Sequence, residues 1–167
     1  MDAEAVRDRL TQSGLVLLAF ELVKKLIVRR VKDFYADTTF GRGLPFQSYE
    51  QDVLSRHKIV FEASLRYLRD HMQAIDAEDE RKVQGLREYR NRIAHDLPNI
   101  IVSMSVEESS RILKDARDCL FKLSNFWVYI DIGADPDFRD QGIDWDTVAG
   151  SEFMLLDEII RQLEELK

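Results

Sequence analysis

Apolar side chains recur every three or four residues along most of the chain, which is the spacing of one face of an α-helix. The clearest stripe runs from Ile112 to Ile130, and another runs from Val53 to Met72. Residues 15–20 are apolar on all sides, as in a helix at the centre of a bundle. We therefore predict an all-α fold, an up-down bundle of four to five helices.

Start and stop signals bound these helices. Ser105 and Glu108 have capping-box spacing, Ser151 is placed to cap the last helix, and Pro98 stops the third. Only 99–104 shows strand-like alternation. The loop 36–48 contains a Gly-x-Gly, which is weak evidence for phosphate binding because no strand precedes it. The predicted helices span about 3–34, 49–75, 77–95, 105–130 and 151–167.

The same signals divide the chain into three parts. Residues 1–132 form the predicted bundle, 133–150 an acidic linker, and 151–167 a C-terminal helix that packs either on the bundle or on a partner. With 167 residues, 45% of them apolar, the chain can build one good core but not two.

The composition limits the kinds of functional site that the chain can form. The single cysteine, Cys119, excludes an intrachain disulfide and a Cys-rich zinc site. His57, His71 and His95 lie far apart, so we expect no metal and no cofactor. His57 falls inside an apolar stripe and is interpreted as a packed core or interface histidine. The chain starts with acidic, polar residues and has no apolar run of about 20, so we expect a cytoplasmic protein without a membrane partner.

Charge is distributed unevenly. The net charge is −7, but residues 135–167 hold 10 acidic and 3 basic side chains, which leaves 21 of each sign before them. A nucleic-acid contact is therefore compatible with the acidic composition if it is local and avoids the tail. The first helix becomes basic between Lys24 and Lys32, where the charges either complement the helix dipole or contact phosphates.

The segment 87–96 carries the strongest chemical signal. Residues 81–95 hold five basic side chains against one acid and end in His95. Histidine is the side chain best suited to proton transfer near neutral pH. On a helical wheel, Arg90 lies within or beside the apolar sector, whereas Asn91 and His95 share another face. An arginine so placed needs either a carboxylate of a neighbouring helix or a cleft that admits a phosphate.

Arg90 and His95 are about 140° apart on an ideal helix. They converge if the helix ends near His95, if the long arginine side chain extends around the helix, or if two copies of the helix meet in a homodimer. We favour the homodimer. A second Arg-x4-His match joins Arg66 to His71, but it has Tyr67 in place of the polar residue. We interpret that match as coincidence.

The run from Arg90 to His95, with Asn91 after the arginine, resembles the signature of the HEPN superfamily. That signature is an arginine, a polar residue and a histidine near the end of a bundle helix, often followed by a turn or a proline, here Pro98. The resemblance covers about residues 10–130 and excludes the acidic tail.

The resemblance implies a metal-independent endoribonuclease, as in toxin or phage-defence proteins, with RNA as its substrate. His95 would act as general base or acid on the ribose 2′-hydroxyl or the leaving oxygen. Arg90 would hold the phosphate and stabilise charge in the transition state, and Asn91 would orient the histidine or the substrate. Arg87 and Arg92 are candidate phosphate contacts. The product would be a 2′,3′-cyclic phosphate.

Two other interpretations remain open. One is a non-catalytic HEPN-like module that binds RNA, a nucleotide or a protein partner such as an antitoxin. The other is a structural helical domain, which predicts Arg90 in a core ion pair and His95 alone on the surface. The tyrosine that is modified in antitoxin-paired members of the family is replaced here by Leu97, so we expect no regulation of that kind.

Overall fold

A computed structural model describes residues 2–38, 46–139 and 141–165, and within these ranges every regular element is helical. The predicted all-α class is confirmed. The predicted Gly-x-Gly turn lies outside the described residues. The elements are α1 (Ala3–Lys24), a π-helical turn (Lys25–Arg29), α2 (Arg30–Thr38), α3 (Phe46–Asp52), a 3-10 turn (Leu54–Arg56), α4 (Val60–Asp70), α5 (Ala77–Ser103), α6 (Val106–Ile132), α7 (Pro136–Arg139), a second 3-10 turn (Trp145–Thr147) and α8 (Ser151–Glu165).

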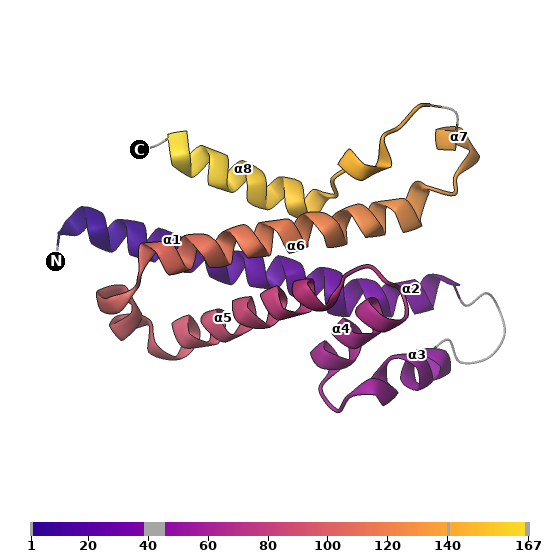
Figure 1. Cartoon of the computed structure of the whole chain (residues 1–167), viewed down its shortest axis with the longest axis horizontal. Helices are drawn as coiled ribbons and strands as arrows, with labels where there is room; N and C mark the ends of the chain where they lie inside the picture. The colour runs from indigo at the N-terminus through magenta and orange to yellow at the C-terminus, as the bar shows by residue number, and fades with distance from the viewer. Residues whose placement is uncertain (1, 39–45, 140, 166–167) are drawn as a thin grey trace.

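The long helices lie side by side and alternate in direction (Figure 1). α1 and α6 run the same way through the middle, α5 returns along one side of them, and α8 returns along the other. α3 and α4 cover the end of the bundle at which α2 finishes. The core between them is apolar and includes Val16, Ile27, Leu65, Leu86 and Leu120, all fully buried.

α1 continues through the π-helical turn into α2, so the first helix ends at Thr38 rather than near residue 34. A π-turn adds a residue to the helical repeat and rotates the side chains that follow. Leu26 and Ile27 are both buried in this turn, and Val31 is buried after it. The rotation therefore keeps one apolar face against the bundle over the whole length.

The predicted single helix 49–75 is wrong. The chain breaks at His57, whose extended backbone (φ −165°, ψ 149°) separates the 3-10 turn from α4. The Ile59 N–H donates to His57 Nδ1 across the break at 3.0 Å. The break lets Val53 on one side and Leu65 on the other reach the same core, both fully buried. His57 is a half-buried loop residue rather than a packed core histidine.

α5 begins as a capped helix and changes direction once. The Asp76 side chain accepts from the N–H groups of Glu78 and Asp79, which completes a capping box. At Asp96 the backbone leaves the helical region (φ −143°, ψ 43°), and a second helical segment follows up to Ser103. The strand-like stretch 99–104 is thus a helical turn. The first segment ends at His95, the predicted position.

α6 carries the predicted apolar stripe, with Leu113, Leu120 and Trp127 buried, although Ile130 at its end is exposed. Ser105 caps the helix, since its Oγ accepts from the Glu108 N–H at 3.1 Å. The second hydrogen bond of the predicted capping box, from the Ser105 N–H to the Glu108 side chain, does not form. The Glu108 carboxylate pairs with Arg92 of α5 instead.

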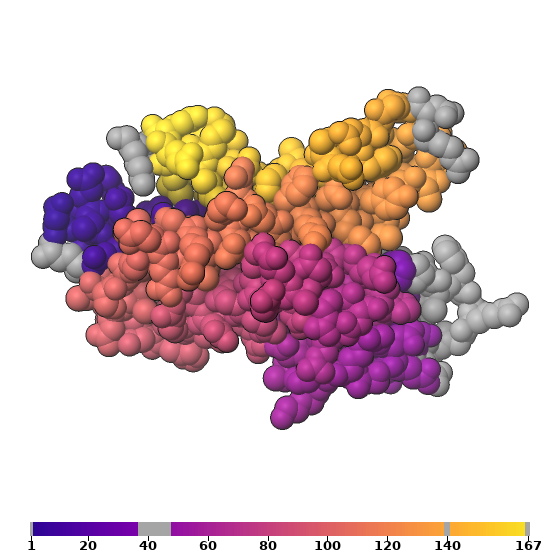
Figure 2. All heavy atoms as spheres, in the orientation of Figure 1, coloured from indigo at the N-terminus to yellow at the C-terminus, as the bar shows by residue number. Residues whose placement is uncertain are grey.

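α8 lies along α6 and buries one face against it. Leu156 is fully buried, and the Phe153 ring meets Phe121 edge-on at 5.1 Å. Figure 2 shows α8 and the 3-10 segment before it as two ridges on one side of the molecule, with a notch between them. Within the described ranges, the helices lack the length and apolar character needed to cross a membrane.

Candidate functional site

The site predicted from the sequence lies at the break in α5. Pro98 has no N–H to donate, and its ring clashes with the carbonyl oxygen four residues earlier, so the helix cannot pass through it unbent. The chain turns two residues before the proline, at Asp96. The Asp96 carboxylate then accepts from Asn99 Nδ2 at 2.9 and 3.0 Å and holds the second segment. His95 consequently stands in the last turn of the first segment.

Arg90 is held between α5 and α1. Its guanidinium lies 5.2 Å from the centre of the Phe20 ring, and Nη2 is 3.6 Å from Glu21 Oε1. Its side chain is 32% exposed. Nη1 donates to Asn91 Oδ1 at 3.2 Å, but Nε is buried and has no hydrogen-bond partner among the described residues. Because an unpaired buried donor is costly, Arg90 has a hydrogen bond left to satisfy.

Asn91 is half-buried, and its amide oxygen faces Arg90. His95 is exposed, and its ring has no hydrogen bond, ion pair or ring contact within the part of the chain that the structure describes. Five residues of helix separate Arg90 from His95, which is about 7.5 Å of rise. A single copy therefore brings Arg90 and Asn91 together and leaves His95 apart from them.

The two flanking arginines are both paired. Arg87 pairs with Glu62 of α4 and stacks on Phe61, with its guanidinium carbon 5.1 Å from the ring centre. Arg92 Nη2 lies 2.6 Å from Glu108 Oε1 of α6. With Glu21 of α1 beside Arg90, each arginine of this helix end has a carboxylate from a different neighbouring helix. Paired in this way, Arg87 and Arg92 are placed to orient α5.

Glu21 and Phe20 are the site residues that sequence reasoning did not select. Glu21 is the one charged residue in an apolar run of α1, and that interruption is the signal that could have found it. Its second carboxylate oxygen lies 3.5 Å from Lys24 Nζ. Glu21 thus sits between two cations, and both of its ion pairs are longer than a hydrogen bond.

The described side chains include no group of three or more His, Cys, Asp or Glu that could hold a metal ion. The site offers a partly exposed guanidinium, an adjacent amide, and a solvent-accessible imidazole at a helix end. No protein-family model, curated protein or solved structure matches this chain.

Proposed function

We propose that this protein is a metal-independent endoribonuclease of HEPN type, with Arg90, Asn91 and His95 as its reactive residues. The observation that carries the proposal is the backbone break at Asp96. It ends the helix immediately after His95 and exposes the imidazole at the tip of the basic segment. The Arg90 side chain is 32% exposed, so the exposed part of its guanidinium can contact a phosphate oxygen.

The proposed reaction needs two copies of the chain. His95 is about 140° round the helix from Arg90, so the imidazole meets an arginine only if a second copy presents its own α5 end. Exposed aliphatic side chains at the same end of the bundle support such a contact. Leu10, Val102 and Val106 are all exposed, and Arg9, next to Leu10, donates to the Ile101 and Val102 carbonyl oxygens at the end of α5.

In this arrangement the chemistry is an intramolecular transfer. His95 takes the proton of the ribose 2′-hydroxyl, and O2′ attacks the adjacent phosphorus. The bond to the 5′-oxygen breaks, and that oxygen takes up the proton from the His95 imidazolium, which restores the neutral histidine. Arg90 stabilises the added negative charge on the phosphate oxygens, and Asn91 holds Arg90 in place through its amide oxygen. The product is a 2′,3′-cyclic phosphate and a free 5′-hydroxyl.

The test is cleavage of end-labelled total RNA and tRNA in EDTA. We expect the wild type to cut and to leave cyclic-phosphate ends, and Arg90→Ala and His95→Ala to be inactive. His71→Ala is the matched control for the histidine, because it belongs to the second Arg-x4-His match and should retain activity. Arg81→Ala, an exposed arginine earlier in α5, is the control for Arg90. Absence of cleavage by a folded, dimeric wild type would refute the proposal.

One observation favours a second candidate, a non-catalytic module of the same type. All three arginines at the end of α5 already have carboxylate partners, as a helix end kept for its structure would. That candidate predicts no cleavage by the wild type, together with RNA or nucleotide binding that Arg90→Ala weakens and His95→Ala leaves unchanged.

A further inference from the structure

Three cations at the corner between the 3-10 turn and α4 have no acidic partner among the described residues. Arg56, Lys58 and Arg66 lie farther than ion-pair distance from every carboxylate that the structure describes. This sets them apart from Arg87, Arg90 and Arg92 of α5, each of which has a carboxylate partner. We call these three residues the basic corner.

Backbone and ring contacts hold the two arginines of the basic corner. Arg56 Nε donates to the Asp52 carbonyl oxygen at 2.6 Å, and its guanidinium carbon lies 5.4 Å from the centre of the Tyr67 ring. Arg66 Nη1 donates to the Arg56 carbonyl oxygen at 3.2 Å. None of these contacts neutralises charge, so the exposed Arg66 and the half-buried Arg56 are both oriented and keep guanidinium N–H groups for an anion.

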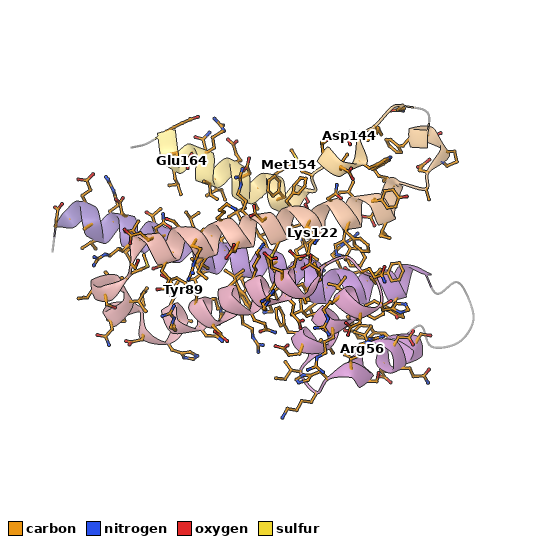
Figure 3. The ribbon with its side chains drawn as sticks, in the orientation of Figure 1. Arg56, Tyr89, Lys122, Asp144, Met154 and Glu164 are labelled. Atoms are coloured by element: carbon orange, nitrogen blue, oxygen red, sulfur yellow. The ribbon has the colours of Figure 1, made fainter. Side chains whose placement is uncertain are left out.

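The charges of the basic corner affect a neighbouring carboxyl group. The pKa of the exposed Asp70 carboxyl is lowered, first by its hydrogen bond with Arg69 and then by the fields of Arg56 and Arg66. The acidic tail lies on the far side of the bundle and does not offset these charges. Figure 3 shows Arg56 on the side opposite to Asp144 and Glu164.

The basic corner also adjoins the proposed active site. Phe61 lies between Lys58 and Arg66 in the chain, and its ring is 6.0 Å from that of Phe20, on which Arg90 stacks. Arg87 of α5 stacks on the Phe61 ring. The buried Phe61 and Phe20 rings thus carry the partly exposed Arg87 and Arg90 side chains, which lie between the basic corner and the end of α5.

We propose that the basic corner is a docking site for the phosphate backbone of single-stranded RNA, which leads the strand to Arg90. The inference rests on the proposed ribonuclease function for its direction. Arg87 and His95 are separated by about 12 Å along the axis of α5, because each of the eight intervening steps rises about 1.5 Å. That is several times the ~3.4 Å axial spacing of phosphates in a helical strand. A dinucleotide can therefore occupy the active site alone, whereas a longer RNA engages both places.

The experiment is RNA binding by the full chain carrying His95→Ala, which prevents cleavage. A fluorescein-labelled single-stranded RNA of about 16 nucleotides is titrated between about 50 and 200 mM salt. Charge reversal by Lys58→Glu and Arg66→Glu should weaken binding about tenfold or more. It should also reduce the slope of log K against log salt by about 1.4, which is two phosphate contacts. The matched control is Arg111→Glu with Lys114→Glu on α6, which changes the net charge equally and should leave both quantities unchanged.

Because reversal could disturb α4, the milder pair Lys58→Gln and Arg66→Gln should reduce binding in the same direction. Absence of RNA binding, or equal affinity and slope in the charge-reversed chain and its control, would overturn the docking site. Ile59 and Val60 are exposed beside the basic corner. Loss of binding to phosphatidylserine vesicles with unchanged RNA affinity would assign the corner to a membrane surface and overturn it equally.

Cleavage of a dinucleotide separates the two proposals. The charge-reversed chain is made again with His95 intact for this assay. Dinucleotide turnover at the wild-type rate, with longer RNA bound more weakly, supports docking. If the charge-reversed chain turns over the dinucleotide and binds longer RNA as tightly as the wild type, the docking proposal is refuted and the nuclease proposal stands. If the wild type turns over no dinucleotide but charge reversal still weakens RNA binding, the nuclease proposal fails and the docking site stands.

Discussion

Replacing Arg90 with alanine should leave the fold almost as stable as before. Its ion pair with Glu21 is 3.6 Å long, and the two side chains are 32% and 51% exposed. A pair of this kind contributes about 0.2–1 kcal/mol. The stack on Phe20 adds about 0.5–1 kcal/mol. Against these, the substitution removes a buried Nε with no partner, whose penalty is about 1–3 kcal/mol.

The opposing contributions nearly cancel, so we expect the free energy of unfolding of Arg90→Ala to lie within about 1 kcal/mol of the wild type. Urea denaturation followed by circular dichroism measures this difference. Arg87→Ala is the comparison, because its partner Glu62 is largely shielded and also accepts from Gln84 at 2.8 Å. Removing Arg87 should cost more than removing Arg90.

A loss of about 3–5 kcal/mol in Arg90→Ala would refute this reasoning, because that is the cost of breaking a buried ion pair. Such a result would make Arg90 a structural residue, as the helical-domain interpretation predicts. A near-neutral change together with loss of RNA cleavage would separate its chemistry from its packing.

Three further substitutions test the fold. Gly14→Ala should stabilise by about 1 kcal/mol and raise Tm by about 2–4 °C, because a Cβ at this exposed position in α1 meets nothing within 4 Å; an unchanged or lower Tm would contradict it. Leu156→Ala should cost about 2–5 kcal/mol in urea unfolding, because this fully buried side chain anchors α8; a loss below about 1 kcal/mol would show α8 detached. The Asp79 N–H and the Lys122 ammonium lower the pKa of Asp76 to about 2 from 3.8, so its stabilisation is present above pH 3.8 and is lost as the pH falls towards 2. Asp76→Asn should therefore be less stable than the wild type at neutral pH and converge with it at low pH, and a constant difference across the acid titration would contradict this.

Local signals predicted the features that depend on neighbouring residues in the chain. The stripe of α6 follows from helical spacing alone, and the end of the first α5 segment follows from Pro98. The cap of α6 by Ser105 also rests on residues within one turn. These features needed no knowledge of the rest of the fold.

Features set by distant residues could not be predicted in the same way. The break at His57 forms because both halves of the segment reach one core, whereas the local spacing is that of a continuous helix. The carboxylates beside Arg90 and Arg92 come from α1 and α6, and their pairing depends on how the helices pack. The basic corner also depends on packing, because the tertiary fold decides which cations have a described carboxylate beside them.

The most direct test of the proposed site is complementation between two inactive chains. Arg90→Ala and His95→Ala chains are each assayed alone for RNA cleavage in EDTA, then unfolded together, refolded as a mixture and assayed again. If Arg90 of one copy works with His95 of the other, the mixture should regain about one quarter of wild-type activity. This follows because half of the dimers are mixed and each of those has one intact site. A mixture as inactive as its two components, in dimers shown to have exchanged, would contradict a site shared between two copies.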